Sequence, residues 1–408
     1  MKSKFKKFIF IFVIAFILPT YVLADAGLLV GRNYGNGNID TSVDITNAQI
    51  QFALNGIGYI SSTNPTYAWI TGNQNGIKRL ENQILFFSGH GNQNYMIFYD
   101  QNHTSNYSFK ITGTASYSDI PTIKLTSYNM SKVKLAVFAG CETGIGSTNI
   151  ASQTKNAGVK ATLGWKVSIS VASHTSWLQR FWSKIFNTGL GNMNTALQYA
   201  NSFTYDDPGV KNISTYGQWS SAYSALSTNN NTLYNSNKNM SNLNVDNRKH
   251  NLNINTYGKT EESKLSLLEK YIISNINPFF KLSNCQTKKT AGQNYNIYDI
   301  TYVLSGDIKT KLGYTIFEEN NNFVALYDNT KNIDYKSINS INNDGDNQKY
   351  NNLNVNINEI INSQDAIIKN KETYKYYDDE TQKIYYVIRL YLIDNNGVSY
   401  VKIYKYEI

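Results

Sequence analysis

Two short runs of consecutive apolar residues stand out along the chain, ILFF within QILFF at 83–87 and LAVFA within VKLAVFA at 133–139. Unbroken apolar runs of four or five residues are typical of strands buried on both faces, as in a parallel sheet. Each run ends in a glycine-flanked turn, SGHGN at 88–92 and GCETG at 140–144. The pattern predicts two buried strands, each carrying one chemically reactive side chain, His90 or Cys141, into a tight turn.

The first half of the chain alternates predicted strands and helices. Strands are expected at 27–31, from 59, at 83–87, at 133–139 and at 159–171, with short hairpin strands at 95–99, 107–112 and 123–125. Helices are expected from an Asp44 or Thr46 cap to Gly56, at 147–156, from Ser173 to Gly189, and around 196–203. This alternation predicts an α/β fold with a mostly parallel sheet and helices on both faces.

The second half has a different composition. Asn and Ser dominate residues 227–255, which predicts a solvated linker with Arg248 and Lys249 as an exposed basic pair. Helical periodicity at 261–273 and 357–368, with alternating strands at 295–327 and 383–408, predicts an α+β accessory region of two degenerate repeats. The predicted organisation is an export signal at 1–24, a first domain at 25–226, a linker at 227–258 and an accessory domain at 259–408.

The amino terminus predicts export. Four lysines precede an apolar run at 8–18, and Val22-Leu23-Ala24 offers a cleavage site before Asp25. A retained anchor is the alternative, but the run is short for a membrane-spanning helix. We therefore expect a secreted or cell-surface protein with no stable membrane insertion after cleavage. Loss of the four lysines lowers the formal net charge from +9 to about +5, without a basic cluster that would predict nucleic-acid binding.

Cysteine is scarce, with Cys141 and Cys285 as the only two. They can pair as one disulfide, which is the structural alternative for Cys141. A secreted scaffold that depends on disulfides contains many more cysteines, so a single cysteine in a glycine turn favours a nucleophile. The helix expected just after Cys141 favours a thiolate there.

His90 is the only one of four histidines that follows a predicted strand in a glycine turn, and its alternative role is purely structural. His103 and His250 lie in polar segments and are expected to be solvated, while His174 is expected at the surface or as a helix cap. No cluster has zinc-ligand spacing, so no metal or other cofactor is predicted. The Asn/Asp-rich stretches at 328–334 and 342–347 lack a full EF-hand pattern and are expected to be solvated turns.

The motifs FFSGHG at 86–91 and LAVFAGCETG at 135–144 resemble those of the caspase-like cysteine peptidases of clan CD, and are closest to the CHAT branch. The similarity continues through GWKV at 164–167 and ALQYA at 196–200. It covers about residues 26–204. The carboxyl-terminal region is weakly similar to the PepSY-type modules attached to secreted peptidases.

This resemblance implies an endopeptidase with a Cys–His dyad. Cys141 would be the nucleophile and His90 the general base and acid, with the backbone N–H groups of Gly91 and Cys141 as the oxyanion hole. The segment Trp165, Lys166 and Val167 would receive the substrate as an added strand. Ordinary core packing is the alternative for Trp165.

The function expected from the sequence is therefore that of a secreted cysteine endopeptidase that hydrolyses protein or peptide substrates through a thioester. We further expect that the carboxyl-terminal region keeps the enzyme latent until the linker is cut near Arg248 and Lys249. The alternative is a non-catalytic secreted binding protein on a caspase-like scaffold. The residue preferred on the amino side of the scissile bond and the oligomeric state are left open by the sequence.

Overall fold

A computed structural model describes most of the chain: residues 25–32, 34, 39–55, 57–74, 76–99, 108–187, 193–219, 246–291, 295–304, 308–330, 367–378, 381, 383–393 and 399–407. The predicted export signal, His103 and the Asn/Asp-rich stretch at 342–347 lie outside these residues. Within them, no helix is both long and apolar enough to cross a bilayer.

The central element is a six-stranded sheet in the order β12-β11-β10-β5-β1-β2. Its strands are β1 (Asp25–Val30), β2 (Gly58–Ser62), β5 (Ile84–Ser88), β10 (Leu135–Ala139), β11 (Ala161–Trp165) and β12 (Ile213–Gly217). All neighbours pair in parallel except β11 and β12, which are antiparallel. The expectation of a mixed α/β fold with a mostly parallel sheet is confirmed. The two apolar runs at 83–87 and 133–139 form the central strands β5 and β10.

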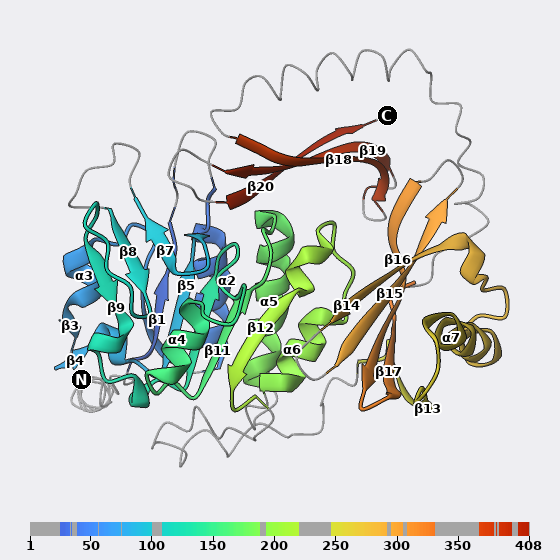
Figure 1. The fold of residues 1–408 in the computed structure, drawn as a ribbon, viewed down its shortest axis with the longest axis horizontal. Helices are drawn as coiled ribbons and strands as arrows, with labels where there is room; N and C mark the ends of the chain where they lie inside the picture. Colours follow the sequence, from blue (N-terminus) through green and yellow to red (C-terminus); the bar gives the residue numbers. More distant parts are fainter. Residues whose placement is uncertain are drawn as a thin grey trace, which may run out of the picture.

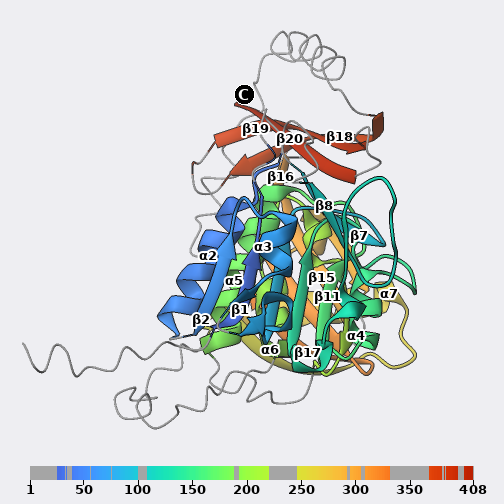
Figure 2. The same cartoon turned by 90° about the vertical axis from the view of Figure 1, so that its left-hand side faces the viewer.

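Helices cover both faces of this sheet (Figures 1 and 2). One face packs against α2 (Ser42–Leu54), α5 (Val171–Asn187) and α6 (Met193–Asn201), and its core includes Trp177 and Trp182. The other face packs against α4 (Ile150–Asn156), while α3 (Tyr67–Thr71) lies near the far edge. Every residue of β5 and of β10 is buried, as their unbroken apolar runs require.

A small second sheet begins directly after β5. Its order is β6-β7-β8-β9, formed by β6 (His90–Gly91), β7 (Tyr95–Phe98), β8 (Phe109–Thr112) and β9 (Thr122–Lys124). The last three match the predicted hairpin strands. A two-stranded hairpin, β3 (Asn73–Gln74) with β4 (Ile77–Lys78), and short 3₁₀ turns complete this half of the molecule.

In the second half of the chain, the described residues form one extended mixed sheet and one α-helix, α7 (Glu261–Asn275). Its first part contains β13 (Lys249–Asn255), β14 (Cys285–Ala291), β15 (Asn296–Leu304), β16 (Ile308–Glu319) and β17 (Asn322–Asp328). Its second part is the meander β18 (Ile367–Asp378), β19 (Lys383–Ile393) and β20 (Ser399–Glu407). The two parts join at one residue pair between β16 and β18, Lys309 with Tyr376. Figure 1 shows the meander lying across the end of the central sheet.

Four expectations for individual segments are corrected. The strand predicted at 159–171 ends at Trp165, because residues 166–170 leave the sheet and α5 begins at Val171. Residues 249–255, predicted within the linker, form β13 and pair with β17. Arg248 is buried rather than exposed, since its guanidinium binds Asp246 and Asn329. Of the helix predicted at 357–368, only residues 367 and 368 are described, and they begin β18.

A buried ion pair connects the first half of the chain to the extended sheet. The Lys211 ammonium lies 2.6 Å from the Asp299 carboxylate, with side-chain exposures of 1% and 7%. The same carboxylate accepts a hydrogen bond from the Thr315 hydroxyl. Burial lowers the pKa of Lys211, while Asp299 opposes that shift. Because each charge depends on the other for compensation, the pair fixes β15 against the 3₁₀ turn η4 (Pro208–Lys211).

We expect Lys211→Met to lower the free energy of unfolding by about 3–5 kcal/mol, because it leaves the Asp299 carboxylate buried without a countercharge. Urea denaturation followed by tryptophan fluorescence measures the change. The matched control is Lys383→Met, which removes a lysine from the exposed pair with Glu407 and should leave the midpoint unchanged. Equal denaturation midpoints for Lys211→Met and the wild type would contradict a stabilising role for the Lys211–Asp299 ion pair.

Candidate active site

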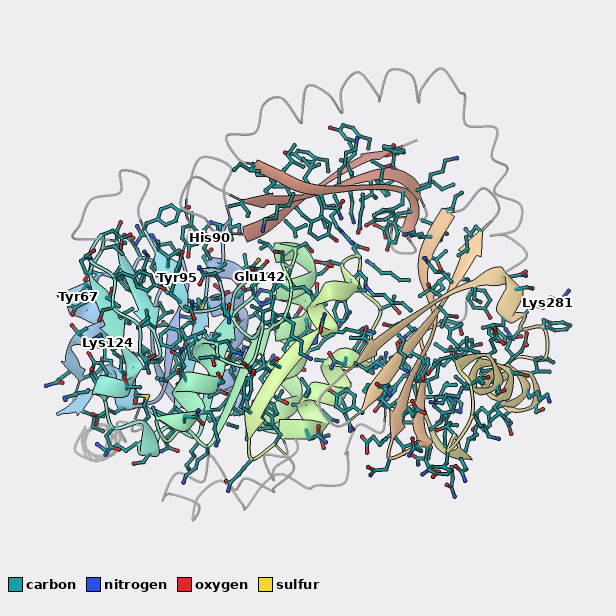
Figure 3. All side chains as sticks on the ribbon, in the orientation of Figure 1. Tyr67, His90, Tyr95, Lys124, Glu142 and Lys281 are labelled. Carbon is teal, nitrogen blue, oxygen red and sulfur yellow. The ribbon has the colours of Figure 1, made fainter. Side chains whose placement is uncertain are left out.

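The two glycine turns emerge side by side at one edge of the central sheet. β5 and β10 are parallel neighbours, and Ser88 is in register with Ala139. Just beyond this pair, the Gly89 N–H donates to the Ala139 carbonyl at 3.1 Å. His90 and Cys141 each follow the paired residues by two positions. The parallel pairing therefore brings the turns of His90 and Cys141 to the same edge of the sheet, and Figure 3 shows His90 and Glu142 at the end of the sheet that faces β18–β20.

Glycines allow the two turns to pack backbone to backbone. A Cβ atom on Gly140 would lie 2.8 Å from the Gly89 carbonyl oxygen, and one on Gly91 would lie 2.7 Å from the Thr143 methyl group. Both distances are shorter than ordinary van der Waals contact. The glycines flanking His90 and Cys141 therefore serve the close approach of the turns as well as their bending.

Thr143 fastens the Cys141 turn to the neighbouring strand. Its hydroxyl is 2.7 Å from the Phe138 carbonyl, to which it donates, and accepts a hydrogen bond from the Trp165 N–H. The Gly144 N–H also donates to the Trp165 carbonyl, at 2.7 Å. Thr143 and Gly144 of the Cys-Glu-Thr-Gly motif thus hold the turn against the end of β11.

Glu142 adopts a left-handed backbone conformation, with φ of 60°. A non-glycine residue rarely adopts this conformation, and such strain is often found at functional sites. Its N–H donates to the Val167 carbonyl, and its carboxylate accepts from the Ser168 hydroxyl at 3.2 Å. These bonds hold the turn against the segment that follows β11.

The Cys141 thiol is buried, with 4% of the residue exposed. Its sulfur lies 3.4 Å from the Ile169 nitrogen and 3.8 Å from the Ile169 carbonyl oxygen. Cys141 and Cys285 are separate free thiols, so the structure contradicts the disulfide alternative. Among the described residues, the hydrogen-bond partners of the sulfur come from the segment 168–169, and His90 is not one of them.

Burial raises the pKa of the Cys141 thiol to about 12; the hydrogen bond from Ile169 lowers it, and the carboxylates of Glu142 and Asp207 raise it further. The expected stabilisation of a thiolate by a following helix is wrong. Helix α4 begins at Ile150, nine residues after Cys141, because the intervening residues form turns. In this conformation the sulfur is held as a protonated thiol.

His90 lies in a cluster of aromatic rings. Its imidazole stacks parallel to Tyr99, with ring centres 5.8 Å apart, and is tilted against Tyr34 at 4.5 Å. The backbone N–H of His90 donates to the Tyr34 hydroxyl, which in turn donates to the Ile97 carbonyl. Burial raises the pKa of Tyr34, so this hydroxyl stays protonated. The pairing of β6 with β7 and the two tyrosines therefore fix the position of the imidazole.

A buried polar cluster next to these turns was missed by sequence reasoning. The Asp44 carboxylate is fully buried, accepts hydrogen bonds from the Ser88 and Thr175 hydroxyls, and lies 3.5 Å from Nδ1 of His174. Thr41, rather than Asp44 or Thr46, caps α2, whose first turn contains Asp44. The prediction of a surface position for His174 is wrong, because this residue is only 4% exposed and packs edge-on against Trp165.

The predicted substrate-binding residues separate into two groups. Trp165 is fully buried and donates from its indole nitrogen to the Val210 carbonyl, which favours the core-packing alternative. Lys166 and Val167 instead line a cavity of about 700 Å³ between the first half of the chain and the strands β14–β16, β18 and β19. Among the described residues, no group of three or more His, Cys, Asp or Glu side chains is arranged to hold a metal ion.

No family model matches this chain, and a comparison with curated proteins finds no significant sequence match. The chemical interpretation of the site therefore depends on its geometry and on the two sequence motifs.

We expect alkylation of Cys141 by iodoacetamide at pH 8 to be at least about 100-fold slower in the folded chain than in urea, because a raised pKa leaves little thiolate. A Cys285→Ala background leaves one thiol to follow by mass spectrometry. The rate in the folded chain should keep rising as the pH is raised above 9, whereas that of the unfolded chain levels off near its ordinary pKa of about 8.5. Equal rates in the two states would contradict the buried thiol.

Proposed function

We propose that this protein is an exported cysteine endopeptidase of the caspase-like type, in which Cys141 is the nucleophile and His90 the general base and acid. One observation carries the proposal. Two adjacent parallel strands end in register, and each is followed by a glycine turn that bears one member of a potential Cys–His dyad. The carboxyl-terminal edge of a parallel sheet is where chemistry collects in α/β proteins.

The proposed chemistry requires a thiolate that attacks the carbonyl carbon of the scissile peptide bond. The His90 imidazole accepts the thiol proton and later donates it to the leaving amine, so that a thioester remains on Cys141. A water molecule activated by the same imidazole then hydrolyses the thioester. The N–H groups of Gly91 and Cys141 are proposed to bind the oxyanion, a role for preorganised donors in a site closed to water.

In the conformation described here, the dyad is proposed to be inactive. The sulfur bonds to the Ile169 main chain, its pKa is raised, and both His90 and Cys141 are less than 5% exposed. These features support the expectation of a latent enzyme. They do not favour activation by cleavage after Arg248, since its guanidinium is buried and bound to Asp246, Asn329 and Ser202. The PepSY-like identity of the accessory region stays a prediction.

The test is labelling of Cys141 by a thiol-directed peptide probe, in the intact chain and after limited proteolysis. We expect proteolysed wild type to be labelled, Cys141→Ala to be unlabelled, and His90→Ala to be labelled about 10²- to 10⁴-fold more slowly, as for loss of a general base. His250→Ala is the control, because this histidine lies on β13 in the accessory sheet and its removal should leave the rate unchanged.

The alternative of a non-catalytic binding protein predicts a different result. Failure of a broad panel of peptide probes to label Cys141 in any proteolysed form would overturn the peptidase proposal. Labelling at equal rates in wild type and His90→Ala would remove His90 from the proposed dyad.

A further inference from the structure

The last strand of the chain lies directly on the candidate active site. β20 contacts β6, the two-residue strand that contains His90. One residue of β20, Val401, forms a parallel β-bridge with Ser170. Ser170 follows Ile169, whose main chain holds the Cys141 sulfur. Figures 1 and 2 show the β18–β20 meander across one end of the central sheet, and Figure 3 labels His90 at that end.

Through the Val401–Ser170 bridge, the main chain of β20 pairs with the segment that follows β11. Within the central sheet, β11 has no free edge, because β10 and β12 pair with its two sides. A peptide bound near Cys141 by strand addition must therefore use the residues beyond Trp165. β20 already occupies that position at Ser170, so a substrate strand and β20 cannot both pair there.

Electrostatic contacts fasten the meander at this position. The Asp206 carboxylate lies 2.9 Å from the Lys405 ammonium of β20 and 3.2 Å from the Lys311 ammonium of β16. Burial disfavours the charge of Asp206, but these lysines keep the pKa of its carboxyl below the usual value. The Arg389 guanidinium of β19 also donates to the Asp206 carbonyl. Lys405 and Arg389 of the meander therefore both contact Asp206, a residue of the first half of the chain.

An apolar contact of Ile39 also holds the meander on the first half of the chain. Ile39 packs against a cluster that contains Ile388, Leu390 and Leu392 of β19. The same Ile39 packs in the Tyr34 cluster, and its carbonyl accepts the Tyr34 N–H at 3.0 Å. Since Tyr34 contacts the His90 ring, the meander packs on the structure that positions the proposed general base.

We propose that β20 is an internal inhibitory strand, which occupies the substrate position beside Ser170 and is held there by the ion pair between Asp206 and Lys405. This inference rests on the proposed peptidase function and names the element that regulates it. The first part of the accessory sheet stays fixed through the buried Lys211–Asp299 pair, and the meander opens as a separate unit.

The test uses the full-length, uncut chain and follows the rate at which a thiol-directed peptide probe labels Cys141. In a closed–open equilibrium this rate is proportional to the open fraction. We expect Lys405→Glu to label about three- to tenfold faster than wild type, because it turns an attraction to Asp206 into a repulsion. Lys405→Arg keeps the charge and should label at the wild-type rate. Lys383→Glu, the same change in the same meander but against Glu407, should also match wild type.

Hydrogen exchange over residues 399–407 gives a second measurement, and Lys405→Glu should increase it. If Lys405→Glu labels no faster than Lys383→Glu, or if exchange over β20 is unchanged, the inhibitory strand is overturned. The peptidase proposal survives that outcome provided that proteolysed wild type is still labelled at Cys141. Absence of labelling in every form, including proteolysed chains, overturns both.

Discussion

The site depends on the parallel pairing of β5 and β10. This pairing sets Ser88 level with Ala139 and places the two glycine turns in contact, since the Gly89 N–H bonds back to Ala139. A shift of one residue would send each strand's buried side chains to the opposite face of the sheet, where the helices differ. Both faces of these strands are apolar, so polarity alone does not fix the register; it is fixed by the different packing on the two faces, with Phe86 in one core cluster and Phe87 in the other. The position of His90 relative to Cys141 is therefore set by the sheet rather than by either turn.

The environment of the two side chains is set by elements that are distant in sequence. Ile169 holds the sulfur of Cys141 from the segment between β11 and α5. Tyr34 and Tyr99 hold the imidazole of His90 from the loop after β1 and the end of β7. Asp44 binds Ser88 and approaches His174, which links the first turns of α2 and α5 to the end of β5. In the conformation that the structure describes, both side chains are buried, and the raised pKa of Cys141 keeps its thiol protonated.

The differences between expectation and structure follow a common cause. The polarity of Arg248 and His174 predicts that both side chains are exposed. This prediction is wrong, because both are buried among specific partners. Trp165 lies in a strand that the motif associates with substrate, yet its indole packs against His174 and Trp177 of α5 and lies in the core. In each case a contact with a residue distant in the sequence overrode the local signal: Asn329 for Arg248, Asp44 for His174 and Val210 for Trp165. Local polarity carries no information on such contacts.

The sequence by itself determined the strands, their glycine turns and the two reactive residues, because consecutive apolar residues and glycine are local signals of buried strands and sharp bends. It also determined that two regions of different composition follow one another. Only the tertiary structure decided that the sulfur bonds to Ile169, that Asp44 and His174 are buried beside Ser88, and that β20 lies over the site. Those contacts arise from packing between segments that are far apart in the sequence, such as Ser170 with Val401 and β6 with β20, and no local pattern specifies them.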